Sequence, residues 1–311
     1  MPAETLDEPS FLHVSVMLEE VVQAFAGVNG VVVDATAGGG GHSHALLSRY
    51  PEISVLAFDR DPLAVRAASE RLAEFGARAR VTHASFSELD ARLEELGVSR
   101  LDGLLADFGV SSQQLALGER GMSFRIEGPL DMRMDTTRGE TARELIERLS
   151  QDELADVIYE LGEERASRRV ARCIKQALER DELSTTLDLR RAVVRAMGPR
   201  RVGGVDPATR TFQALRMAVN EELDELGALL ELGRARLNPE GIAAFISFHS
   251  LEDRRAKREF AERDFWQRLT PKPLLAGPTE QAENPRSRSA KLRIGRRLGP
   301  VGEMALFEED E

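Results

Sequence analysis

The first third of the chain alternates between short β-branched runs and longer stripes with helical spacing. A helix is predicted from about Val16 to Phe25, because its apolar residues fall on one face. The apolar runs that follow predict four strands, at Val31–Val33, Ile53–Phe58, Arg80–Ala84 and Leu101–Ala106. Strands that alternate with helices are typical of an α/β fold whose parallel sheet is buried on both faces.

The alternation stops in the middle of the chain, where every periodic segment from Glu140 to about Met197 is helical. The sequence from Ser150 to Glu153 predicts a capping box at the start of one of these helices. The α/β pattern then returns with a long helix from about Phe212 to Leu237 and a strand at Ile242–Phe248. The return of this pattern indicates that an all-helical segment interrupts a single sheet.

Domain limits follow from where these patterns change. We expect an inserted all-helical domain at 119–208 and a sheet domain made of 11–118 and 209–307. Proline density predicts a loop at 270–285, ahead of the last part of the sheet domain.

The composition of the chain excludes several classes of protein. The chain has 311 residues with 42 Lys+Arg and 53 Asp+Glu, a formal net charge of −11. The single cysteine, Cys173, excludes a disulfide framework and a cysteine-rich metal site. The first ten residues hold three acids and no base, unlike a targeting peptide, and no apolar run reaches the ~18 residues of a membrane span. We therefore expect a cytoplasmic protein that does not contact membranes.

Four consecutive glycines, Gly38–Gly41, directly follow the first strand and open a helix. Glycines there let backbone N–H groups approach a ligand, and the helix N-terminus adds a positive field. Asp59 ends the next strand, where an acid typically accepts hydrogen bonds from ribose hydroxyls. A merely flexible turn is the alternative, but Asp34 before the glycines and Asp59 after them favour a nucleoside cofactor. Because Ser43 replaces the last glycine of the dinucleotide fingerprint, these residues leave a dinucleotide and S-adenosylmethionine both open.

Further polar and aromatic residues follow other strands. Asp107 ends the fourth strand, at the edge of an open α/β sheet where ligands bind, although it could instead cap the following turn. His249 follows the fifth strand and could orient a substrate or serve as a hydrogen-bonded structural residue. Phe86 could stack on a purine or belong to the core. Gln114 could reach the ligand or face solvent, and His42 offers its backbone N–H within the glycine loop.

Several classes of active site are excluded by what the sequence lacks. No pair of histidines has the spacing of metal ligands, so we predict that no metal binds. The chain has no G-x-S-x-G elbow, and no lysine follows the glycines as in a phosphate-binding P-loop. Hydrolases with a nucleophile elbow and P-loop kinases are therefore set aside.

Two segments are strongly basic in an otherwise acidic chain. Residues Arg286–Arg297 include six Lys/Arg and no acid, and serines lie among them. The segment Arg165–Arg201 of the helical domain holds eleven bases against four acids. Such local excess predicts surfaces that contact nucleic-acid phosphates.

The sequence resembles the bacterial family of 16S ribosomal RNA cytidine N4-methyltransferases, known as the RsmH or MraW family. The resemblance covers nearly the whole chain and rests on segments that occur in the same order. They are HVSVMLEE, DATAGGGGHS, AFDRDP, DFGVSSQQL, RGMSFRIEGPLDMRMD, GEERASRRVAR, ATRTFQALRMAVNEEL, ISFHSLEDRRAKR and NPRSRSAKLR. The segment RGMSFRIEGPLDMRMD after DFGVSS is specific to that family.

This resemblance implies a Rossmann-like S-adenosylmethionine-dependent methyltransferase sheet with an inserted all-helical domain. It implies S-adenosylmethionine as cofactor, 16S rRNA within the small ribosomal subunit as partner, and methylation of a cytidine N4 in the decoding centre, in the P-site region. Carried over position by position, the implied cofactor contacts fall on Gly40, Gly41, His42, Asp59, Phe86, Asp107 and Gln114.

The implied reaction is direct methyl transfer to an exocyclic amine. That amine is a poor nucleophile, so acceptors that hold its hydrogens would assist, and Asp107 and His249 are the candidate catalytic residues. We expect charge reversal at Arg293 and Arg296 to weaken RNA binding. Two rival hypotheses are a methyltransferase acting on DNA or a small molecule, and a non-catalytic binding module or assembly factor. The oligomeric state is not indicated.

Overall fold

A computed structural model of the chain describes residues 15–199 and 206–299. The chain divides into two compact units, a discontinuous one formed by Met1–Gly109 and Glu225–Glu311 and a continuous one formed by Val110–Asp224. The predicted inner domain limits at 119 and 208 both lie within this continuous unit and stay a prediction. The predicted outer limits at 11 and 307, and Arg200 and Arg201 of the predicted basic surface, lie outside the described residues.

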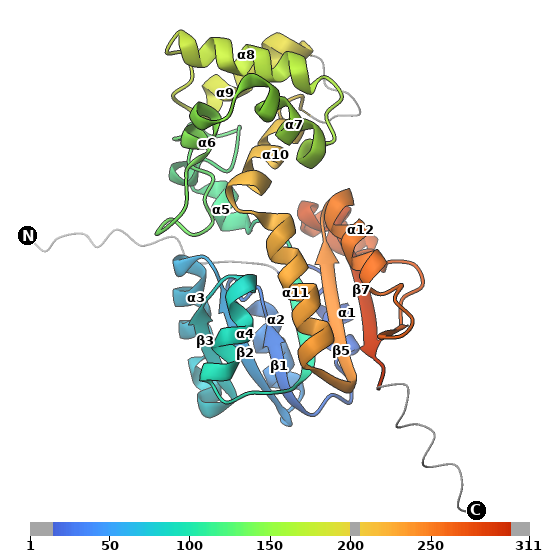
Figure 1. Cartoon of the computed structure of the whole chain (residues 1–311). Coiled ribbons are helices and arrows are strands. Elements are labelled where there is room, and N and C mark those ends of the chain that lie inside the picture. The colour runs from blue at the N-terminus through green and yellow to red at the C-terminus, as the bar shows by residue number, and fades with distance from the viewer. Residues whose placement is uncertain (1–14, 200–205, 300–311) are drawn as a thin grey trace, which may run out of the picture. The chain divides into compact units, whose positions relative to one another are not determined.

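The discontinuous unit is built on one sheet, in which the described residues form seven strands in the order β3-β2-β1-β4-β5-β7-β6 (Figure 1). The first five are parallel, β7 runs antiparallel to β5, and β6 runs antiparallel to β7. The strands are β1 (Gly30–Asp34), β2 (Ile53–Asp59), β3 (Ala79–His83), β4 (Leu101–Asp107), β5 (Leu237–Ser247), β6 (Trp266–Arg268) and β7 (Lys291–Arg297). The predicted strands are thus confirmed to within a few residues.

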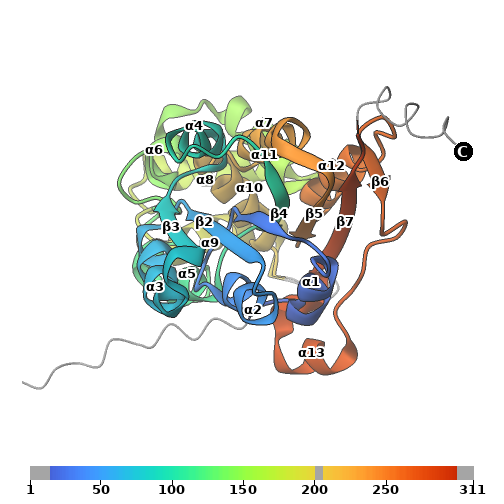
Figure 2. The same ribbon diagram turned by 90° about the horizontal axis from the view of Figure 1, so that it is seen from below.

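Alternate strand residues face opposite sides of this sheet and pack against different helices. Val32 and Leu105 join α1, α2 and α3 in one core, whereas Val33, Leu104 and Phe245 join α4, α11 and α12 in another. Figure 2 shows the helices on the two sides of the sheet. The helices are α1 (Leu18–Ala24), α2 (Gly41–Arg49), α3 (Pro62–Leu72), α4 (Leu89–Glu95), α11 (Glu222–Arg236) and α12 (Ser250–Glu259), with 3₁₀ turns η1 (Ala73–Arg78) and η2 (Phe86–Glu88).

The continuous unit is helical and has a core of its own. Its apolar residues cluster with one another between Val110 and Leu215. The predicted capping box at Ser150 is confirmed, because Ser150 Oγ accepts from the N–H of Glu153 and the Glu153 carboxylate accepts from the N–H of Ser150. The helices are α5 (Ser112–Ala116), η3 (Gly118–Arg120), α6 (Ala142–Arg148), α7 (Gln151–Gly162), α8 (Ser167–Glu179), α9 (Thr186–Met197) and α10 (Thr209–Val219).

The single long helix predicted from Phe212 to Leu237 is wrong. The structure has two helices there, α10 and α11, separated at Asn220 and Glu221. Glu221 has a φ of 49°, which ends the α-helical path. The apolar spacing continues through the break, so the sequence pattern could not reveal it.

The C-terminal part also differs from its prediction. The stretch predicted as a loop contains α13 (Pro278–Glu283), which starts with proline in its first turn. The basic segment forms η4 (Pro285–Ser289) and β7 rather than one exposed surface. Arg293 is buried, and its Nε lies 2.7 Å from Oδ1 of Asp253, so its charge is already neutralised by a partner within the fold. The expectation that Arg293 contacts RNA is therefore wrong.

No helix among the described residues combines the length and the apolar character that crossing a lipid bilayer requires.

Candidate active site at the carboxyl ends of the strands

The glycine loop turns tightly between β1 and α2. Gly38 and Gly40 have φ values of 51° and 74°, which residues with a side chain rarely adopt. At Gly41 the reason for glycine differs, because a Cβ there would come within 2.0 Å of Ser15 Oγ. The loop conformation therefore depends on glycine at three positions, and one of them serves packing rather than access to a ligand.

Asp59, at the end of β2, holds this loop in place. Its Oδ2 accepts from the N–H of Gly38 at 2.8 Å, and its Oδ1 accepts from the N–H of Asp61 at 2.9 Å. Burial raises the pKa of Asp59 to about 6, and the nearby acids Asp61 and Asp34 add to this, while the two backbone hydrogen bonds oppose it. Each carboxylate oxygen keeps a further lone pair, so Asp59 can still accept from a ribose hydroxyl.

A chain of hydrogen bonds links the ends of β1 and β4. Ser43 Oγ donates to Oδ2 of the buried Asp34 at 2.6 Å, and the N–H of Thr36 donates to Oδ1 of Asp34 at 3.1 Å. Thr36 Oγ1 in turn accepts from the N–H of Asp107 at 2.7 Å. These contacts fix Asp107 at the point where the strand order reverses, between β1 and β4, which is where open α/β sheets bind ligands. The sequence analysis missed Thr36.

Asp107 itself has an unsatisfied carboxylate. Its Oδ1 is buried and has no hydrogen-bond partner within residues 15–199 and 206–299. Burial raises the pKa of Asp107 to about 6, and the charges of His42 and Arg286 oppose this rise. A buried acceptor without a donor is costly, so this oxygen suits a ligand or substrate that brings an N–H or O–H group.

His42 is buried in the first turn of α2. Its Nε2 lies 2.9 Å from the carbonyl oxygen of Val16, and because a carbonyl only accepts, Nε2–H donates. The ring thus anchors the residues before α1. A cofactor contact through the backbone of His42 stays a prediction.

Phe86 packs against the core, as one of its two alternatives predicted, whereas Gln114 is buried and does not face solvent, which was its alternative. Phe86 packs edge-to-face on Phe108 with ring centroids 6.4 Å apart and is only partly buried. Gln114 belongs to the helical unit, where its Oε1 accepts from the N–H of Ser111 at 2.9 Å and closes a capping box for α5. Their roles toward a cofactor stay predictions.

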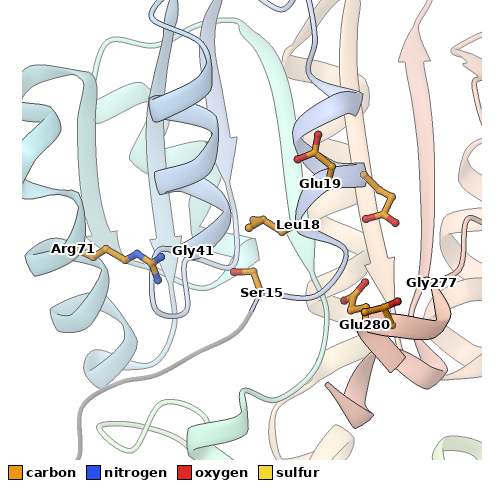
Figure 3. A pocket seen from close by; sticks show the side chains of 9 residues that line it. Ser15, Leu18, Glu19, Gly41, Arg71, Gly277 and Glu280 are labelled. Atoms are coloured by element: carbon orange, nitrogen blue, oxygen red, sulfur yellow. The ribbon is translucent and has the colours of Figure 1, made fainter. Parts of the chain in front are cut away.

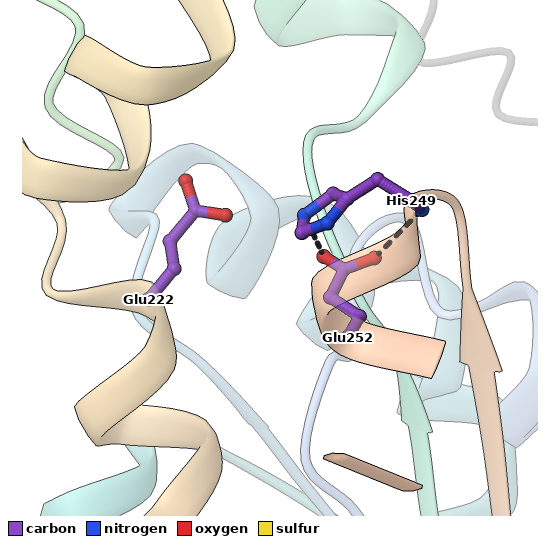
Figure 4. Close-up of side chains that lie close together, drawn as sticks. All are labelled: Glu222, His249 and Glu252. Carbon is purple, nitrogen blue, oxygen red and sulfur yellow. Dashed lines mark hydrogen bonds and ion pairs between the residues drawn. The ribbon is translucent and has the colours of Figure 1, made fainter. Parts of the chain in front are cut away.

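His249 follows β5 and pairs with Glu252, a buried residue of α12 that the sequence analysis missed. His249 Nε2 lies 3.0 Å from Oε1 of Glu252, and the N–H of His249 donates to Oε2 at 3.3 Å (Figure 4). The spacing of three residues at a helix start was the available signal. Ser247 beside it is 1% exposed, and its Oγ donates to the carbonyl of Lys291. His249 is thus positioned by Glu252, and the absence of a metal stays a prediction.

A surface hollow of about 540 Å³ reaches Gly41 of the glycine loop. Figure 3 shows Ser15, Leu18 and Glu280 among the side chains around it. Arg71 of α3 also lines it and donates from Nη1 to the carbonyl of Gly39 at 3.4 Å. Ser15 and Arg71 therefore support the loop, and neither was predicted.

The strand order, the glycine loop at the end of β1 and the acid at the end of β2 define a Rossmann-like fold of the kind that binds a nucleoside cofactor. S-adenosylmethionine fits the residues present, since its ribose hydroxyls can donate to the lone pairs that the Asp59 carboxylate keeps. The choice between a dinucleotide and S-adenosylmethionine, open at the sequence level, is decided by comparison with known proteins.

The chain belongs to the MraW methylase family, whose sequence profile matches residues 10–298. It is 60% identical over 294 residues to the ribosomal RNA small subunit methyltransferase H of Sorangium cellulosum (strain So ce56), covering 94% of this chain and 93% of that protein. The protein of the same name from Prochlorococcus marinus (strain MIT 9303) is 49% identical and is matched over 97% of its length and 96% of this chain. The chain is thus an S-adenosylmethionine-dependent methyltransferase, and the resemblance stated from its motifs is confirmed.

Proposed function

We propose that this protein methylates 16S ribosomal RNA in the small subunit, on the exocyclic N4 of a cytidine in the decoding centre. Its family and the names of its relatives, which are small-subunit ribosomal RNA methyltransferases, support the class of substrate. The observation that supports an amine as the methyl acceptor is that Oδ1 of Asp107 is buried and has no hydrogen-bond partner among the described residues. A protein that acts on this substrate works in the cytoplasm.

The cofactor would be held by the carboxyl edge of the sheet and would supply an electrophilic methyl group. Asp59 would accept from the ribose hydroxyls and Phe86 would lie against the adenine. The proposed contacts are Gly40, Gly41, His42, Asp59, Phe86, Asp107 and Gln114. In this proposal the sheet domain (11–118 and 209–307) binds the cofactor and the helical domain (119–208) contacts RNA.

Asp107 would act on the target amine. The N4 lone pair of cytosine is delocalised into the ring. A carboxylate that accepts a hydrogen bond from the N4–H group returns electron density to the nitrogen. The bound cofactor would supply the methyl group to N4 and retain the bonding electron pair on its sulfur, and Asp107 or water would take the proton that N4 gives up. With a pKa of about 6, Asp107 is mostly ionised at neutral pH and able to accept. His249, held by Glu252, is the second candidate beside the amine.

The proposal is tested on small ribosomal subunits from cells that lack this methylation. We expect the purified protein and S-adenosylmethionine to produce N4-methylated cytidine at the decoding centre, identified by mass spectrometry after RNA digestion. Cofactor binding without methylation of these subunits, or methylation of naked DNA instead, would refute the proposed substrate and favour one of the rival hypotheses.

A further inference from the structure

α8 is amphipathic, with one apolar, buried side and one charged, exposed side. Val170, Ala171, Ile174 and Ala177 are buried in the core of the helical unit. On the solvent side, arginines follow one another at helical spacing, starting just before the helix, at Arg165, Arg168, Arg169 and Arg172. All four are exposed, so they are available to a partner.

Three of these four arginines are without a counter-ion. Arg168 lies 3.0 Å from Asp152 and 3.4 Å from Asp156, both on α7. The guanidinium groups of Arg165, Arg169 and Arg172 have no hydrogen bond or ion pair within the described parts of the chain. Arg168 offsets only one of these two aspartates, but the four arginines still outnumber the three neighbouring acids, Asp152, Asp156 and Glu160, so this face keeps a positive excess.

An aromatic ring lies next to these charges. Tyr159 of α7 is 58% exposed, and it is the one aromatic ring among the large apolar side chains that are exposed in the described residues. Together with Glu160 and the arginines it lines a hollow of about 990 Å³ on the exposed sides of α7 and α8. A ring flanked by arginines is the arrangement with which proteins bind single-stranded nucleic acid, because the bases stack on the ring and the arginines contact phosphates.

The three arginines of α9 do not share this property. Arg190 pairs with Asp206 at 2.8 Å, Arg195 pairs with Glu182 at 3.4 Å, and Arg191 forms an ion pair with Asp188. Within the described part of the segment from Arg165 to Arg201, the arginines without a counter-ion therefore gather near the start of α8 and not on α9.

We propose that Tyr159, Arg165, Arg169 and Arg172 form a binding site for single-stranded RNA, here called the α7–α8 face. The arginines contact successive backbone phosphates and the tyrosine ring stacks on an unpaired base. The proposal rests on the proposed function, because it assigns a place where the substrate RNA is held apart from the reacting base.

The test compares two double variants of equal charge change, Arg169→Gln/Arg172→Gln on the α7–α8 face and Arg191→Gln/Arg195→Gln as the matched control. The probe is a fluorescein-labelled single-stranded RNA of about 20 nucleotides, longer than ordinary site sizes. We expect the first variant to bind about 10- to 30-fold more weakly, and the slope of log affinity against log salt to fall by about 1.4. The control should match the wild type, and both variants should bind S-adenosylmethionine normally.

The tyrosine is tested separately. Tyr159→Ala should weaken RNA binding about tenfold, whereas Tyr159→Phe, which keeps the ring, should bind as the wild type does. Unchanged affinity and salt slope in the arginine variant would overturn the proposal, as would a loss confined to whole ribosomal subunits, which would indicate a protein contact. If the variants lose RNA binding while the wild type methylates no rRNA, the proposed function fails and this site stands.

Discussion

Burial of Asp107 disfavours the ionised form of its carboxyl group. Its pKa rises from 3.8 to about 6 on folding, so the folded protein binds this proton more tightly than the unfolded chain. The resulting contribution to stability is fully present below about pH 4 and is lost as the pH rises through 6. At pH 8 the ligand-free protein therefore carries a buried carboxylate that disfavours folding.

We predict that Asp107→Asn stabilises the ligand-free protein at pH 8 by about 1–3 kcal/mol, because it removes this charge without emptying the site. The gain should shrink at pH 4.5, where the wild-type carboxyl is protonated. Methyl transfer should fall by about 100-fold or more, since the amide returns less electron density to the amine. Urea unfolding at both pH values and turnover assays measure the two effects.

Asp61→Asn is the control, because Asp61 is also buried but caps α3 through its Oδ1, a role that asparagine keeps. It should change stability little at either pH. A loss of stability in Asp107→Asn at pH 8 would show that Asp107 serves the fold rather than the reaction.

The acidic residues at the strand ends could be predicted from the sequence, whereas the residues that hold them in place could not. Asp59 and Asp107 follow apolar runs, and the topology of parallel sheets brings such positions to one edge. Thr36 and Ser15 act through contacts with residues distant in the sequence, such as Thr36 Oγ1 with the N–H of Asp107. Nothing in their local sequence distinguishes them from ordinary polar residues.

At the scale of elements, the break between α10 and α11 is stabilised by one side chain. Asn220 is 2% exposed, its Oδ1 accepts from the N–H of Met134 at 2.7 Å, and its Nδ2 donates to the carbonyl of Met132 at 2.8 Å. Met132 has a φ of 62°, an unfavourable value for a residue with a side chain. Asn220 thus ends a helix and also holds a strained segment within the same unit.

We predict that Asn220→Ala destabilises the helical unit by about 2–4 kcal/mol, because it leaves a buried N–H and a buried carbonyl without partners. Urea unfolding followed by far-UV circular dichroism measures this loss. Gln176→Ala, on the exposed side of α8, should stay within about 0.5 kcal/mol of the wild type. Equal stability of the two variants would contradict the role given to Asn220.

Elements were predictable where a local pattern alone determines them. The parallel strands β1, β2 and β4 are short apolar runs that are largely buried, and their bounds were predicted to within a few residues. The helix break depends on tertiary hydrogen bonds, and α13 begins at a proline within a stretch read as a loop. β7 is basic in sequence yet buries Arg293, because Asp253 of α12 neutralises it.

At the scale of the molecule, the apolar clusters respect the division into two units. Among the residues that the structure describes, the buried core of the helical unit comes from Val110–Leu215 alone, and the two cores of the sheet unit take none from that range. A unit with its own core and a continuous chain has what independent folding requires.

We therefore predict that the fragment Val110–Asp224 folds alone, with a helical circular dichroism spectrum and cooperative urea unfolding. The fragment Ser15–Gly109 should not, because β4 would lack its neighbour β5. Gradual, non-cooperative unfolding of the helical fragment would show that it depends on the sheet unit.

The pairing of Leu101 in β4 with Leu237 in β5 has a consequence during synthesis. A ribosome completes β4, then makes the entire helical unit, and only afterwards produces the strand that covers the edge of β4. At ordinary elongation rates that edge stays open for about 10–20 s, during which it is prone to pair with other chains. The helical unit can fold in this interval, while the edge that carries Asp107 is completed last. A nascent chain thus acquires its candidate active site only near the end of translation.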